Sequence, residues 1–112
     1  MKISFEAIGQ QYVTFLAGSG AKEGGVCKIG SNATVDACTA GDVFCGVVTE
    51  LRGGAAAVLT AGYCELAYEG TVPTVGYCKL VAAAGGVAVG AAGREYLVVN
   101  VDTGAKTVGL FL

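Results

Sequence analysis

The sequence contains no histidine, a single proline and few charged residues. Without histidine, the chain cannot form the Ser-His or Cys-His pairs that activate nucleophiles in many hydrolases. Histidine is also a common zinc ligand. The sequence has no Cys-x-x-Cys motif either, so the usual cysteine spacings of zinc and redox sites are absent. Lysine or carboxylate bases stay open in principle. We therefore expect a protein that is not an enzyme, with no catalytic residues and with no metal or other cofactor.

Basic residues are few and scattered, which argues against a nucleic-acid partner. Seven Lys and Arg residues stand against nine Asp and Glu residues, and the pI is near 4.9. Binding to a phosphate backbone depends on clustered basic side chains. A charged content of 14% beside a hydrophobic content of 54% also leaves little polar material to cover a monomer. This balance favours self-association or docking on a larger surface.

Long apolar runs are also missing, although the mean hydropathy is +0.63. The charge-free runs 7–21, 53–64 and 80–93 are shorter than the roughly 20 apolar residues of a membrane-spanning helix. Glu6 follows Lys2 before any apolar segment forms, so no signal peptide is visible. The expectation is a soluble, unprocessed chain made in a cytoplasm, without a membrane partner.

A pentapeptide consisting of Gly, Val or Tyr, Cys, a charged residue and Leu or Ile occurs three times. Its copies begin at Gly25, Gly62 and Gly76, and Pro73 lies in the turn between the last two. Because extended backbone alternates side chains between two faces, each copy predicts a strand with one apolar interior face. The predicted interior pairs are Cys27 with Ile29, Cys64 with Leu66, and Cys78 with Leu80. The uneven spacing of the copies argues against a solenoid.

Glycine-rich turns separate segments that are rich in β-branched, aromatic and other apolar residues. The predicted strands are 2–7, 11–16, 26–29, 33–37, 43–51, 55–60, 63–69, 77–81, 87–89, 96–101 and 107–112. The segment 43–51 is nearly all apolar, so we place it in the middle of the fold, with a bulge or bend at Gly46. Gly104 is expected in the left-handed position of the last hairpin.

The pattern predicts an all-β protein with little or no helix, because glycines cut the alanine runs below the length of a stable helix. The expected architecture is a small glycine-rich β-barrel or sandwich of about nine to eleven short strands. The chain length fits a single β-domain over residues 1–112. Residues 17–25 contain four glycines and read as an exposed, flexible loop.

The cysteines and acidic residues each have a plain structural interpretation. Three of the five cysteines lie with aliphatic neighbours on predicted interior faces, and we interpret the cysteines as buried free thiols. A disulfide or a reactive thiol stays open as the alternative. Glu65 and Glu69 would lie about 13 Å apart along a strand, which is too far for a glycosidase pair. We interpret them as part of a solvated face.

Tyrosines are the only side chains that suggest a binding surface. They either line a ligand groove or an interface, or they belong to the core and its rim. The four in question are Tyr63, Tyr68, Tyr77 and Tyr96. We take Tyr63 and Tyr77, which occupy the same position in two pentapeptide copies, as the candidate interface aromatics.

Several motifs together resemble one protein family. They are Gly-Val-Cys-Lys-Ile from Gly25, Asn-Ala-Thr-Val from Asn32, Ala-Gly-Asp-Val-Phe-Cys-Gly-Val-Val from Ala40, and Gly-Thr-Val-Pro-Thr-Val-Gly from Gly70. This layout, from about Gly25 onward, is similar to that of the small all-β capsid decoration proteins of tailed bacteriophages and prophages, also called head-stabilising proteins. The shared motifs are turn glycines and β-forming residues.

The resemblance implies a structural virion protein that binds the outside of a capsid and stabilises the shell against internal DNA pressure. It implies the major capsid protein as partner, a homo-oligomer with a trimer favoured, and a location on the capsid exterior after synthesis in the bacterial cytoplasm. In this family the N-terminal segment commonly contacts the capsid, sometimes by adding a strand. The matching segment is residues 1–6, the first part of an N-terminal region 1–24 that also includes the flexible loop. Its candidate contact residues are Lys2, Ile3, Ser4, Phe5 and Glu6. Their alternation fits an ordinary strand of the barrel equally well.

Two other functions stay open. A small-ligand or carbohydrate-binding β-barrel is supported only by the tyrosines. The second alternative is a minor tail or baseplate component of a phage particle, because amino-acid composition does not distinguish such a component from a shell protein. The number of copies per particle would distinguish the tail from the shell.

Overall fold

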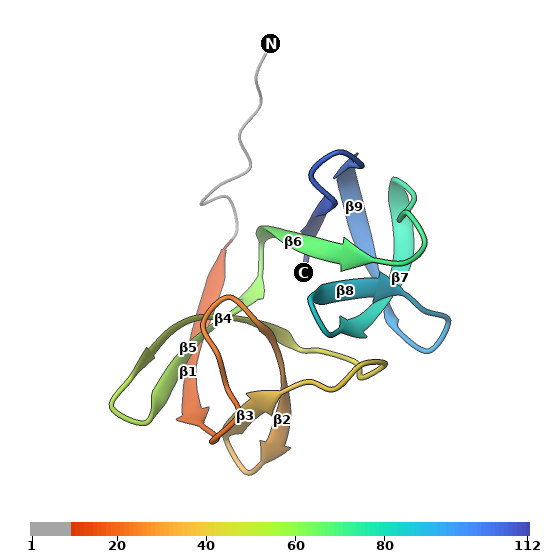
Figure 1. Ribbon diagram of the computed structural model, residues 1–112. Helices are drawn as coiled ribbons and strands as arrows, with labels where there is room; N and C mark the ends of the chain where they lie inside the picture. Colours follow the sequence, from red (N-terminus) through yellow and green to blue (C-terminus); the bar gives the residue numbers. More distant parts are fainter. Residues whose placement is uncertain (1–9) are drawn as a thin grey trace.

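The computed structural model describes residues 10–112, and all regular secondary structure in this range is β-strand (Figure 1). The strands are β1 (Gln11–Ala17), β2 (Val26–Ser31), β3 (Thr34–Ala37), β4 (Gly46–Arg52), β5 (Ala55–Ala61), β6 (Tyr63–Glu69), β7 (Gly76–Ala83), β8 (Gly86–Val89), β9 (Arg94–Asp102) and β10 (Thr107–Phe111). The all-β prediction is confirmed. In this range no helix has the length and apolar character needed to cross a membrane. The strand predicted over 2–7 lies outside the described residues.

The strands close into two barrels of five strands each. The order is β1-β3-β2-β4-β5 in the first barrel and β10-β6-β8-β7-β9 in the second. Figure 1 shows them side by side, with β6 following β5 across a short connection between the barrels. A barrel was expected, but the presence of two was not. That residues 1–112 form one domain stays a prediction.

The second barrel repeats the topology of the first. In the first, β1 pairs in parallel with β3 and antiparallel with β5. In the second, β6 pairs in parallel with β8 and antiparallel with β10. The antiparallel pairs β2/β3, β2/β4 and β4/β5 are likewise matched by β7/β8, β7/β9 and β9/β10. The strands therefore correspond in order, β1 to β6 through β5 to β10.

Even an irregularity of the pairing is repeated. The pairing of β4 with β5 skips one residue of β4 between Val48 and Glu50. The pairing of β9 with β10 skips one residue of β9 between Val98 and Asn100. Such bulges bend and twist a strand, so both barrels close with the same device. The pentapeptide copies at Gly25 and Gly76 mark the equivalent strands β2 and β7.

The predicted interior faces of these pentapeptides are largely confirmed, with one error. Cys27, Leu66, Cys78 and Leu80 are buried, whereas Cys64 is only partly buried. The prediction for Ile29 was wrong, because half of its side chain is exposed. The pairing of β2 with β3 shifts register directly after this residue. Ile29 still pairs with the fully buried Val35, so it lies on the same face of the sheet. It is exposed because it is near the hairpin end, where the core no longer covers it.

The segment predicted as a central strand over 43–51 also needed correction. Strand β4 begins only at Gly46, and a closed barrel has no central strand. The bulge is not at Gly46 either. A Cβ atom at Gly46 would lie 2.5 Å from the carbonyl oxygen of Leu59 and 2.7 Å from a methyl group of Val58. Glycine therefore permits close approach of β4 and β5 at this position.

The turn of the last hairpin, between β9 and β10, differs from the predicted one. Gly104 does not have a positive φ, whereas Lys106 has φ of 55°. The Asp102 carboxylate accepts hydrogen bonds from the backbone N–H groups of Gly104 and Ala105, both at 3.0 Å. An Asp side chain that bonds the backbone two residues on mimics a turn. The turn therefore begins with Asp102 and places its left-handed residue later.

The loop of residues 18–25 is largely exposed, as predicted, but it is attached to β4. The backbone N–H of Gly24 donates to the carbonyl of Val48 at 2.7 Å, and Val48 donates to the carbonyl of Gly25 at 2.9 Å. The Glu23 carboxylate accepts from the N–H of Leu51 at 2.8 Å. The flexibility of this loop stays a prediction.

Candidate functional site

Four large apolar side chains lie in register across the outside of the second barrel. This apolar ladder consists of Tyr63 on β6, Phe111 on β10, Leu97 on β9 and Tyr77 on β7. Residues directly opposite each other on antiparallel strands share one face of a sheet. The alternate residues Val98 and Leu110 are fully buried in the barrel interior. The ladder therefore lies on the outer face.

The ladder is covered at one end and open at the other. Tyr63 is 9% exposed, whereas Leu97 is 37% and Tyr77 is 73% exposed. Val72 and Val75, in the loop before β7, are also exposed. Tyr77 and Leu97 pair directly across β7 and β9, and we call these two residues the Tyr77 face. Neighbouring exposed apolar side chains of this size make the Tyr77 face the candidate docking surface.

The two candidate interface tyrosines thus share one face but differ in role. Tyr77 can contact a partner, whereas Tyr63 is buried at the covered end and packs edge-to-face on Phe111 with ring centroids 5.6 Å apart. Tyr68 and Tyr96 belong to the core. Sequence reasoning missed Leu97. Its alternation with two residues that turn out to be buried, on a segment predicted to be a strand, was the available signal.

A polar network fixes the covered end of the ladder. The Tyr63 hydroxyl donates to Glu65 Oε1 at 3.3 Å. Gly109 lies opposite both Glu65 and Asn100 in the sheet, and a Cβ atom there would overlap with the Tyr63 hydroxyl and Asn100 Oδ1. Burial raises the pKa of Tyr63, with a smaller contribution from Glu65 and an opposing hydrogen bond from Asn100. The missing side chain of Gly109 makes room for this network.

The described surface also has hollows, of which two lie near these residues. A groove of about 460 Å³ runs between the barrels, with Val26 and Cys38 on one wall and residues 65–67 and 83–86 on the other. A second hollow of about 430 Å³ is lined by polar residues that include Glu65, Asn100 and Asp102. Within residues 10–112, no three His, Cys, Asp or Glu side chains are grouped to hold a metal ion. Glu65 and Glu69 are both exposed on β6, as predicted.

The two barrels are joined through Phe44, which the first barrel inserts into the core of the second. Phe44 is fully buried and stacks on Tyr96 with ring centroids 5.0 Å apart and an interplanar angle of 8°. The Tyr96 hydroxyl donates to the carbonyl of Phe44 at 3.0 Å. Two backbone hydrogen bonds of 2.8 Å join Gly41 and Asp42 to Ala82 on β7. The barrels therefore share one hydrophobic cluster.

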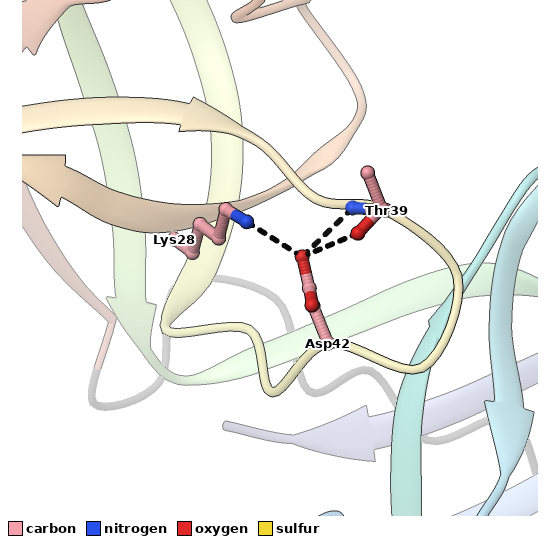
Figure 2. A network of polar contacts seen from close by, with 3 residues as sticks. All are labelled: Lys28, Thr39 and Asp42. Atoms are coloured by element: carbon pink, nitrogen blue, oxygen red, sulfur yellow. Dashed lines mark hydrogen bonds and ion pairs between the residues drawn. The ribbon is translucent and has the colours of Figure 1, made fainter.

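The turn that carries Phe44 is stabilised by the network in Figure 2. Asp42 Oδ2 accepts hydrogen bonds from Lys28 Nζ at 2.8 Å and from the backbone N–H and hydroxyl of Thr39, both at 2.9 Å. The bond to Lys28, followed by those to Thr39, lowers the pKa of Asp42 to about 2. The carboxylate is therefore ionised at neutral pH and fixes the turn in place.

All five cysteines are free thiols, as predicted. The predicted burial is confirmed for Cys27 and Cys78 but not for Cys38, Cys45 and Cys64, which are only partly buried. A hydrogen bond between the thiols of Cys27 and Cys45 raises the pKa of Cys27 and lowers that of Cys45 to about 7. Burial raises the pKa of Cys64 to about 12. Of Cys27, Cys45 and Cys64, Cys45 therefore has the largest fraction of ionised thiolate at neutral pH.

The candidate capsid-contact residues Lys2, Ile3, Ser4, Phe5 and Glu6 lie outside the described residues. Comparisons with known proteins give no match: no family model fits the chain, and no curated protein or solved structure is significantly similar to it.

Proposed function

We propose that this protein is a structural virion component that binds the outer surface of a bacteriophage capsid and stabilises the shell. The observation that supports a docking role is the Tyr77 face, an exposed apolar patch on a closed barrel. The sequence motifs that resemble capsid decoration proteins support the choice of the capsid as partner.

The architecture suits a protein that acts by contact. Closed barrels leave no free sheet edge in residues 10–112, so partners meet side chains on a fixed face instead of adding a strand there. A capsid repeats its binding site many times, so a modest interface per copy is sufficient when neighbouring copies also contact each other. Strand addition stays open for the N-terminal residues 2–6.

The test is co-sedimentation of the purified protein with particles released from the source cells. The tagged full-length chain is expected to pellet with the particles and to saturate. Tyr77→Glu, which places a charge on the Tyr77 face, is expected to bind at least tenfold more weakly. A variant that lacks residues 1–6 is expected to weaken binding as well, because the resemblance assigns a capsid contact to this segment. Failure of the full-length chain to pellet would overturn the proposal, and glycan-array binding that disappears in Tyr77→Ala would favour the carbohydrate-binding alternative.

A further inference from the structure

Two cysteines that are far apart in the sequence, Cys27 and Cys45, lie next to each other where β2 meets the start of β4. Gly46, the residue after Cys45, is the register partner of Cys27. The backbone N–H of Cys45 donates to the carbonyl of Cys27 at 2.8 Å. Cross-strand neighbours joined by a backbone hydrogen bond lie within the Cα separation that a disulfide spans, roughly 4.4–6.8 Å. The backbone therefore already has the spacing of a disulfide, although both thiols are free.

The side chains of the two cysteines also meet, and their surroundings differ. Cys27 is 1% exposed and belongs to the core cluster of the first barrel, whereas Cys45 packs against this cluster and is only partly buried. The Cys27 thiol faces two acceptors, the carbonyl of Gly46 at 3.6 Å and the sulfur of Cys45. Cys27 is thus the enclosed, protonated partner, and Cys45 is the partner that reagents can reach.

A positive charge lies near Cys45. The Arg94 guanidinium lies over the Tyr96 ring, 5.2 Å from its centroid, and this ring stacks on Phe44, the residue before Cys45. The charge of Arg94 adds to the effect of the Cys27 hydrogen bond in lowering the pKa of Cys45. Partly exposed cysteines beside a basic group are the reactive ones, because the thiolate is the nucleophile. Burial instead raises the pKa of Cys38 to about 11.

We propose that Cys45 is a site of oxidation by hydroperoxides and that Cys27 is its resolving thiol, so that oxidation produces a Cys27–Cys45 disulfide within one chain. This inference goes beyond the proposed function and does not depend on it. The bond fastens β2 to the segment that inserts Phe44 into the second barrel. It closes a loop that contains β3 and the turn fixed by Asp42.

The reaction has two steps. The Cys45 thiolate attacks one oxygen of the hydroperoxide, the O–O bond breaks, and the departing oxygen takes up a proton, which leaves Cys45 as a sulfenic acid. The Cys27 sulfur then attacks the Cys45 sulfur and gives up its proton. The S–S bond forms, the S–OH bond breaks, and water leaves. With hydrogen peroxide, two thiols are oxidised to a disulfide and one peroxide is reduced to two waters.

The experiment treats the reduced full-length chain with hydrogen peroxide, blocks the remaining thiols with N-ethylmaleimide and maps the unreduced peptides by mass spectrometry. Trypsin cleaves after Lys22, Lys28 and Arg52, so Cys27 leaves in peptide 23–28 and Cys45 in peptide 29–52. Peptide 29–52 also contains Cys38. The variant Cys38→Ser therefore identifies which cysteine of this peptide is linked.

The wild-type chain is expected to give a linked pair of these peptides, lighter by two hydrogen atoms than their sum, in molecules that stay monomeric. Cys38→Ser should give the same link. Cys64→Ser is the matched control, because Cys64 is also partly buried but its pKa is raised by burial, and it should behave like the wild type. Cys45→Ser should form no link and should lose free thiol about tenfold more slowly.

A second readout separates the two roles. Cys27→Ala removes the resolving thiol and keeps a small apolar side chain in the core, so the sulfenic acid at Cys45 should persist and be trapped by dimedone. Circular dichroism checks that each variant keeps its strands. The inference is overturned by a wild-type chain without the link, by a link that disappears in Cys38→Ser or occurs only in covalent dimers, or by a Cys45→Ser variant that reacts at the wild-type rate.

Discussion

At the scale of single residues, glycine and aspartate determine the local geometry of turns and close contacts, but the sequence does not show which of these roles a given residue has. A turn glycine and a glycine that makes room for a neighbour look the same in a sequence. Gly109 belongs to the second kind, because it makes room for the Tyr63 hydroxyl and for Asn100. Which neighbour fills that space depends on the pairing of β10 with β6 and β9.

Replacement of Gly109 by alanine is expected to destabilise the protein by about 1–3 kcal/mol, because the added methyl group overpacks the covered end of the ladder. The free energy of unfolding from urea titration gives the measurement. Gly104→Ala is the control, since a Cβ atom there would meet only Asp102 Oδ1, at 3.4 Å. Equal stability of the two variants would contradict this role of Gly109.

Asp42 makes a pH-dependent contribution to stability. Its pKa is about 2 in the folded chain, below the ordinary value of 3.8. A lowered folded-state pKa stabilises the protein above the unfolded pKa, and this contribution is lost as the pH falls toward 2. Asp42→Asn should therefore be less stable than the wild type at pH 7, and the difference should shrink between about pH 4 and pH 2.

Urea midpoints measured across this pH range test the prediction. Glu50→Gln is the comparison, because Glu50 has only a longer ion pair of 3.6 Å with the exposed Arg52 and such surface pairs contribute little. A difference between Asp42→Asn and the wild type that does not change with pH would contradict the assignment.

At the scale of strands and loops, most of the prediction succeeded because β-formers and turn glycines are local signals. The segment 63–69 was predicted with the bounds that β6 has, and 11–16 differs from β1 by one residue. The strand expected at 43–45 was wrong for a physical reason. Val43, Phe44 and Cys45 are apolar whether they pair in a sheet or cover another barrel, and only tertiary packing decides between the two.

Phe44→Ala is expected to cost about 3–5 kcal/mol of stability, the range for removing a fully buried aromatic ring. Its neighbour Val43 is the matched control, because this side chain is half exposed and Val43→Ala should cost well under 1 kcal/mol. Chemical denaturation gives both values. Similar losses in the two variants would show that Phe44 does not join the barrels.

At the scale of the whole molecule, the duplication could not be read from the sequence, although one trace of it was visible. The pentapeptide copies at Gly25 and Gly76 do occupy equivalent strands, but a third copy on β6 hid the relation. Outside these pentapeptides, a barrel strand needs only apolar side chains at alternate positions. Two barrels can therefore have the same fold although few of their equivalent residues are identical. The sequence correctly indicated Tyr77 as a candidate surface residue. It could not indicate that Tyr63 is buried, because that burial depends on how the chain packs around Gly109.

The shared cluster around Phe44 and Val47 predicts that the two barrels unfold together. Because the second barrel's core includes these two residues of the first, thermal unfolding should show one transition with equal calorimetric and van't Hoff enthalpies. Phe44→Ala should separate the transitions or broaden them. Two well-separated transitions in the wild type would contradict a single β-domain over residues 1–112.

The central claim is that this chain is a shell protein of a phage particle. Quantitative mass spectrometry of particles released from the source cells, scaled to the major capsid protein, tests it most directly. The account predicts a ratio near one copy per capsid subunit. A few copies per particle would assign the chain to the tail or baseplate, and its absence from well-formed particles would contradict the claim.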